Sequence, residues 1–117
     1  MAWSYIVCEG QDDCPGKVVF ALSGEHSELV VYTEKDGCYR VFPCSIAALL
    51  GVQRGTRTHL ASEAGECVLS KEAAGVWLTL TPTDGPFFSF FLTANEYLLA
   101  LSKLVEAKAV LRRVTLQ

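Results

Sequence analysis

The chain has no long hydrophobic run and only a small excess of one charge. Its 117 residues are 50% hydrophobic and 20% charged, with a formal net charge of −3. The apolar stretches around residues 41–52 and 76–95 are interrupted by proline, serine, threonine and glycine, so no apolar run reaches transmembrane length. The small net charge and the high apolar content also exclude general disorder. We therefore expect one folded domain that does not bind a membrane.

Signatures of catalysis and of metal binding are equally scarce. The residues that could form them are two histidines and five cysteines: His26, His59, Cys8, Cys14, Cys38, Cys44 and Cys67. The first two pairs of cysteines each enclose five residues, more than the two to four usual in zinc sites, and the histidines stand apart from them. The glycine-containing stretch 51–59 lacks the Gly-Lys-Ser/Thr ending of a phosphate-binding loop. We expect no enzyme activity, no metal and no cofactor.

An odd number of cysteines, five, is typical of proteins from a reducing compartment, where thiols stay unpaired. No basic, apolar leader opens the sequence, so we expect a reducing, cytoplasmic setting with free thiols. In that setting the cysteines act mostly as small apolar side chains. A small enzyme or thiol-based sensor, for example one that pairs Cys67 with His26 or His59, remains an alternative.

Period-two alternation of apolar residues predicts eight strands, four in each half of the chain. Turn residues separate them, and they span residues 3–8, 17–22, 28–33, 38–42, 57–61, 66–70, 76–81 and 87–92. A short helix is predicted from Pro43 to just before Gly51. A capping box of Thr93 and Glu96 predicts a long helix that continues to about Arg112. The fold class is therefore α+β.

The two halves follow the same order of four strands and a helix. At an offset of about 49 residues, Gly16 falls on Gly65 and Phe42 falls on Phe91. Each predicted sheet has one apolar face that another layer must cover. We therefore expect two antiparallel sheets, each covered by a helix, in a single domain built of two pseudo-repeats, residues 1–53 and 54–117.

This tandem order, together with segment 66–82 (ECVLSKEAAGVWLTLTP), resembles one superfamily of single-stranded nucleic-acid-binding proteins. The superfamily includes the Pur-alpha repeats, the Whirly proteins and transcriptional coactivator domains. The resemblance implies a curved antiparallel sheet that binds an unpaired DNA or RNA strand, helices that help to form a homodimer, and a role in transcriptional regulation. The chain departs from such proteins in its charge: it has 10 Lys and Arg against 13 Asp and Glu and an isoelectric point near 5.3, whereas phosphate binding favours a basic surface.

Six residues are the predicted contacts with single-stranded nucleic acid. Alternation places Trp77 and Tyr32 away from the apolar rows, where they could stack on bases, and the charge would come from cations nearby. The full set is Lys17, Tyr32, Arg40, Arg54, Arg57 and Trp77. Trp3 and Tyr5 are expected beside the two aromatic residues. The alternative interpretation is that the aromatic residues pack against the other half or a partner, and that the two linker arginines are merely solvated.

The long C-terminal helix is more apolar than one thin sheet requires. Its predicted homodimer interface consists of Leu98, Leu101, Leu104 and Val105; alternatively, this face belongs to the core. The acidic balance and this surplus of apolar side chains favour the competing hypothesis for function. In that hypothesis the chain is an acidic protein-interaction module, for dimerisation or as a scaffold, which binds no nucleic acid.

Overall fold

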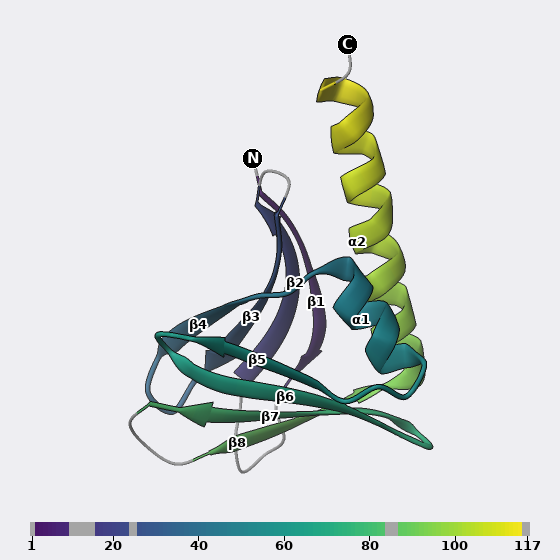
Figure 1. Ribbon diagram of the computed structural model, residues 1–117. Coiled ribbons are helices and arrows are strands. Elements are labelled where there is room, and N and C mark those ends of the chain that lie inside the picture. Colours follow the sequence, from purple (N-terminus) through teal and green to yellow (C-terminus); the bar gives the residue numbers. More distant parts are fainter. Residues whose placement is uncertain (1, 10–15, 24–25, 84–86, 116–117) are drawn as a thin grey trace.

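The computed structural model describes residues 2–9, 16–23, 26–83 and 87–115 (Figure 1). It shows an α+β fold with two four-stranded antiparallel sheets and two helices. The first sheet consists of β1 (Ala2–Glu9), β2 (Gly16–Ser23), β3 (His26–Thr33) and β4 (Cys38–Pro43), and α1 (Ile46–Gln53) follows it. The second consists of β5 (Thr58–Ser62), β6 (Gly65–Glu72), β7 (Gly75–Pro82) and β8 (Phe88–Thr93), and α2 (Ala94–Thr115) follows. Among the described residues, neither helix has both the length and the apolar character that a membrane crossing needs.

Each sheet is a meander, because its strands lie in chain order and each strand pairs with the next. The turn between β3 and β4 confirms the signal of the Asp36-Gly37 dipeptide, since Gly37 adopts a positive φ of 64°. The short helix differs from its prediction at both ends. Pro43 is the last residue of β4, and Ser45 is the N-cap, with its hydroxyl accepting a hydrogen bond from the Ala48 N–H at 3.1 Å. The helix also continues through Gly51 to Gln53, because glycine weakens a helix but does not end it.

Two glycines occupy matching places in the two halves. A Cβ atom at Gly16 would lie 2.1 Å from the Tyr32 carbonyl oxygen, and one at Gly65 would lie 2.3 Å from that of Thr81. The predicted match of Phe42 with Phe91, by contrast, is wrong by one residue. Leu29 and Leu78 match at the offset of 49 residues, and their partners on the next strand are Phe42 and Phe90, which are both fully buried. Helix starts also match, since Thr93 caps α2 by accepting from the Glu96 N–H at 3.2 Å, as Ser45 caps α1.

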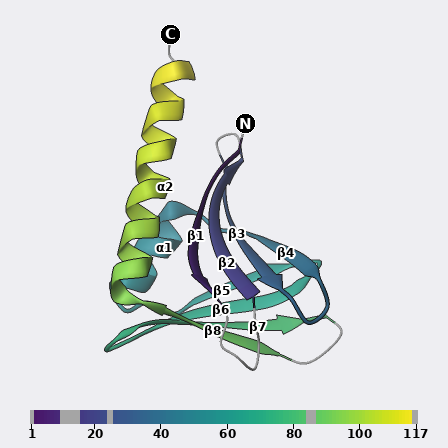
Figure 2. The ribbon, with the colours of Figure 1, turned by 180° about the vertical axis from the view of Figure 1, so that it is seen from behind.

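Each of the two helices packs mainly on the sheet of the other half of the chain. One core joins the inner faces of both sheets to the helices. Helix α2 runs mainly along β1 and β2, whereas α1 contacts β5 and β6 (Figures 1 and 2). Each helix therefore packs mostly on the sheet of the other half. Tyr97 of α2 ties this arrangement together, because its ring meets Phe20 edge-on at 5.7 Å and its hydroxyl donates a hydrogen bond to the Leu49 carbonyl of α1 at 2.5 Å.

Candidate binding faces

The six predicted nucleic-acid contacts are divided among four parts of the molecule. Lys17 and Tyr32 lie on the outer face of the β1–β4 sheet, and Trp77 lies on the outer face of the β5–β8 sheet. Because the inner faces of the two sheets meet in one core, these outer faces point away from one another. A single stacking surface that includes both Tyr32 and Trp77 is therefore not formed. In the register of β1 and β2, Trp3 lies opposite Leu22 and Tyr5 lies opposite Phe20, so neither belongs to the row that contains Lys17 and Tyr32.

The outer face of the β1–β4 sheet carries an aromatic pair beside a cation. The strand register puts Lys17, Tyr32 and Tyr39 in one row across β2, β3 and β4. The two tyrosine rings lie 4.6 Å apart with an interplanar angle of 32°, and Tyr39 is 70% exposed. Sequence reasoning did not select Tyr39. The signal was available, because Tyr39 alternates with Arg40 and the four-residue turn sets the register that pairs it with Tyr32.

The next row of this face is apolar. It consists of Val19, Val30 and Val41, of which Val41 is exposed and the other two are half-buried. Glu28 follows in the third row. The β1–β4 sheet thus presents three exposed or half-buried valines beside the tyrosines, an unusually apolar surface for an uncovered sheet face.

Arg40 is not available to phosphate. It is only 7% exposed, and its guanidinium donates hydrogen bonds to Asp36 Oδ2 and to Thr33 Oγ1, each at 2.7 Å. The same guanidinium lies 6.0 Å from the centre of the Phe88 ring. Hydrogen bonds from Arg40, and then from Thr33, hold the pKa of the Asp36 carboxyl well below its ordinary value. The predicted binding role of Arg40 is therefore wrong: its charge is already neutralised by the partly exposed Asp36 carboxylate.

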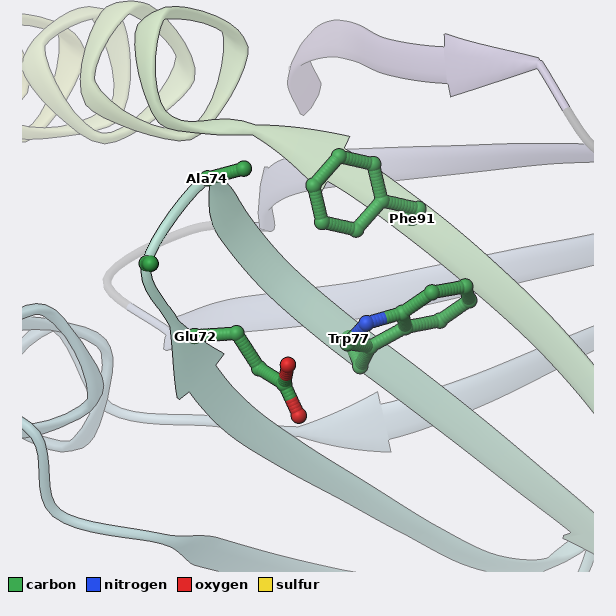
Figure 3. Close-up of a pocket in the computed structure, with 5 residues that line it drawn as sticks. Glu72, Ala74, Trp77 and Phe91 are labelled. Carbon is green, nitrogen blue, oxygen red and sulfur yellow. The ribbon is translucent and has the colours of Figure 1, made fainter.

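The outer face of the β5–β8 sheet carries a second aromatic pair. Ser70, Trp77 and Phe91 form one row across β6, β7 and β8, and the two rings lie 5.0 Å apart at an angle of 51°. Trp77 is 37% exposed. The pair lines a hollow of about 410 Å³ together with Glu72 at the end of β6 and with Ala73 and Ala74 of the β6–β7 turn (Figure 3).

Arg54 and Arg57 are exposed in the connection between α1 and β5. Arg54 is also the C-cap of α1. The end of this helix is held against the β6–β7 hairpin, because Lys71 Nζ donates a hydrogen bond to the Gln53 carbonyl at 2.6 Å. Both arginines thus lie nearer to the β5–β8 sheet than to the tyrosine row.

The predicted dimer interface is split between core and surface. Leu101 and Leu104 are buried against the sheets, so their assignment to an interface between subunits is wrong. Leu98 and Val105 remain exposed. A spacing of three and four residues places all four side chains on one face of the helix. The rest of the fold covers only part of that face, so Leu98 and Val105 stay exposed.

Three cysteines, Cys38, Cys44 and Cys67, are free thiols in two environments. Cys38 is exposed, whereas Cys44 and Cys67 are buried. Burial raises the pKa of Cys44 to about 11 and that of Cys67 to about 12. Among the residues with described positions, no three histidine, cysteine or acidic side chains come together as metal ligands. Of the remaining cysteines, Cys14 lies outside the described residues.

Comparison of the chain with protein-family models, with characterised proteins and with solved structures found no match.

Proposed function

We propose that the protein binds single-stranded DNA or RNA on the outer face of its β1–β4 sheet. The observation that carries this proposal is the row of Lys17, Tyr32 and Tyr39, in which a cation adjoins two tyrosine rings 4.6 Å apart. Unpaired bases stack on exposed aromatic rings with little regard to sequence, and each stack contributes about 1–3 kcal/mol. Tyr39 offers the more accessible ring for such a stack.

The repeated fold supports the same proposal. Four strands and a helix occur twice, the two halves share matched glycines and helix caps, and each helix packs mostly on the other half's sheet. This arrangement supports a Pur-alpha- or Whirly-like domain of two pseudo-repeats. In this chain the helices join the core on the inner side of the sheets, which leaves the outer faces open for a nucleic-acid strand. A role in transcriptional regulation is part of the same proposal.

The charge of this face limits the expected affinity. Lys17 is the cation of the tyrosine row, in which its register partner on β1 is Glu9, and Lys35 is exposed in the adjoining β3–β4 turn. Two phosphate contacts on a single strand give a salt slope of about −1.4 in log units, so a fivefold rise in salt weakens binding about tenfold. Replacing either lysine by glutamine should reduce this slope by about half, because one phosphate contact is lost.

The decisive test is fluorescence anisotropy of labelled 20-nucleotide DNA and RNA strands, titrated with Tyr39→Ala and with Trp77→Ala as its matched control. Tyr39→Ala removes a ring that is mostly in solvent, so we expect at least about a fivefold loss of affinity with an unchanged melting temperature. Trp77→Ala removes a ring from the other sheet and should leave affinity unchanged. No binding at tens of micromolar protein in low salt, or an equal loss in both variants, contradicts the proposal.

The competing function is an acidic protein-interaction module. The exposed Val41 and its half-buried neighbours Val19 and Val30 favour it, because apolar side chains on an open sheet suit a protein surface better than a phosphate backbone. The neutralised Arg40 favours it as well. A Val41→Lys variant separates the two functions, since it adds a cation beside the tyrosine row: nucleic-acid binding should strengthen, whereas an apolar protein contact should be lost.

We also propose a homodimer through the exposed part of α2. Leu98 and Val105 lie two turns apart on this helix and border its buried stripe. Sedimentation velocity of Leu98→Glu/Val105→Glu tests the contact, and we expect a dimer to become a monomer. A wild-type chain that sediments as a monomer at about 100 μM refutes it.

A further inference from the structure

We propose that the hollow beside Trp77 and Phe91 binds an alkylated ammonium group, such as the trimethylammonium of choline or of a trimethylated lysine side chain. The hollow lies on the β5–β8 sheet, away from the tyrosine row, so the inference is independent of the proposed nucleic-acid site. Its lining combines two aromatic rings, a carboxylate and two methyl groups. The five lining residues are Glu72, Ala73, Ala74, Trp77 and Phe91.

The two rings provide the attraction for a cation. The face of an aromatic ring carries negative electrostatic potential, and a cation within about 6 Å of the ring centre is attracted to it, most strongly by tryptophan. The Trp77 and Phe91 rings pack on each other, with centres 5.0 Å apart and an inclination of 51°. Because both rings line the same hollow, one group seated in it can contact both. Trp77 is partly exposed and thus accessible.

The carboxylate of Glu72 gives the hollow a negative charge. Its side chain is exposed at the end of β6 and borders the same space as the two rings (Figure 3). A carboxylate at this position favours a cation and opposes a phosphate group, which is why Trp77 suits a nucleic-acid strand poorly. The cations of this region lie elsewhere: Lys71 donates to the Gln53 carbonyl, and Arg57 precedes β5, whose Thr58 begins the pairing with β6.

The position of the Phe91 ring is fixed by the fold. A Cβ atom added at Gly75 would lie 2.9 Å from Phe91 Cζ, so the ring rests directly over the glycine backbone at the start of β7. The ring therefore does not have to be ordered when a ligand arrives, which removes one entropic penalty of binding. The hollow of about 410 Å³ is at the small end of ligand pockets.

An alkylated ammonium fits this lining better than a bare one. A primary ammonium is strongly hydrated and would lose its water to a mostly apolar lining, whereas methyl groups spread the charge and contact the rings and the Ala73 and Ala74 methyls. Free quaternary ammonium compounds and trimethylated lysine side chains share this chemistry. The experiment must therefore distinguish the two sources.

The test uses the whole 117-residue chain and calorimetric titration with matched probes. Choline is compared with 3,3-dimethylbutan-1-ol, which has the same shape but no charge, and a trimethyl-lysine peptide is compared with its unmethylated form. We expect each cationic probe to bind roughly tenfold more tightly than its control. Tighter binding of the peptide than of choline identifies a modified protein as the source, and the reverse identifies a small molecule. Equal binding of choline and its neutral analogue, or no binding of choline by about 10 mM and of the peptide by about 1 mM, overturns the proposal.

Three variants link the binding to this hollow. Glu72→Gln alters an exposed side chain and should weaken binding severalfold without changing the melting temperature. Trp77→Phe retains a ring and should bind more weakly than wild type, whereas Trp77→Ala should abolish binding. Tyr39→Ala, on the other sheet, should bind choline like wild type. Full binding by Trp77→Ala, in a chain whose circular dichroism shows it to be folded, contradicts the assignment. So does unchanged binding by Glu72→Gln.

Discussion

Replacing Asp36 by alanine should destabilise the protein through Arg40, because it leaves a buried guanidinium without its carboxylate. Arg40 is 7% exposed and donates to Asp36 Oδ2 at 2.7 Å. Removing one partner of a fully buried ion pair costs about 3–5 kcal/mol. Here the Asp36 side chain is 36% exposed, so water screens part of the interaction, and Thr33 still accepts one hydrogen bond. We expect a loss of about 2 kcal/mol in the free energy of unfolding, which lowers the melting temperature by roughly 8–10 °C.

A double-mutant cycle separates this cause from simple loss of contacts. Arg40→Met removes the charge but keeps an apolar chain beside Phe88, so Asp36→Ala should cost clearly less in the Arg40→Met background, where it removes only the hydrogen bonds from Thr33 and the Cys38 N–H. Urea unfolding followed by circular dichroism measures all four chains. If Asp36→Ala costs as much in the Arg40→Met background as it does in the wild type, the two side chains are not coupled and Asp36 does not stabilise the fold through Arg40.

The same pair predicts the pH dependence of stability. The Arg40 and Thr33 hydrogen bonds hold the pKa of Asp36 below its ordinary value of 3.8. A carboxyl group with a lowered pKa stabilises the fold above its unfolded-state pKa, and this contribution is lost as the pH falls toward the folded-state pKa. The stability difference between wild type and Asp36→Asn should therefore be constant above about pH 5 and shrink from about pH 4 downward. A difference that grows on acidification would contradict the lowered pKa.

Two further predictions concern the buried interior. Tyr97→Phe removes the hydrogen bond from the Tyr97 hydroxyl to the Leu49 carbonyl, so the free energy of unfolding should fall by about 1 kcal/mol in urea denaturation, and an unchanged value would show that this hydrogen bond contributes nothing. At pH 8 a thiol reagent should modify Cys38 within minutes but leave Cys44 and Cys67 unmodified until the chain unfolds, because burial and the raised pKa values of these two suppress the thiolate. Peptide mapping by mass spectrometry identifies the modified positions. Rapid modification of either buried thiol would contradict the packing.

The order of the elements could be predicted because its signals are local. Alternation with a period of two depends only on neighbouring residues, and so do the Asp36-Gly37 turn and the cap formed by Thr93. Helix α1 shows where local signals mislead. Gly51 looks like the end of a helix, but the carbonyls of the last turn bond to Arg54 and Thr56, so the helix continues to Gln53.

The candidate sites could be predicted only in part. Alternation correctly separated Trp77 from its buried neighbours and Arg40 from Tyr39. It placed Trp77 correctly on the uncovered face, but the predicted exposure of Arg40 is wrong. The inner face of the β1–β4 sheet includes Arg40, and a partner four residues earlier in the turn, Asp36, makes that burial tolerable.

Periodicity and short turns are enough to specify eight strands, two helices, their order and the side chains that share each face, because each of these properties depends on residues close together in the chain. Which faces stay open is a different matter, since it depends on contacts between residues far apart in the chain. Because α2 packs mainly on the β1–β4 sheet, Leu101 and Leu104 are buried and Leu98 stays in solvent. The joining of the inner faces in one core turns Tyr32 and Trp77 away from each other, because two sheets that share a core expose opposite sides.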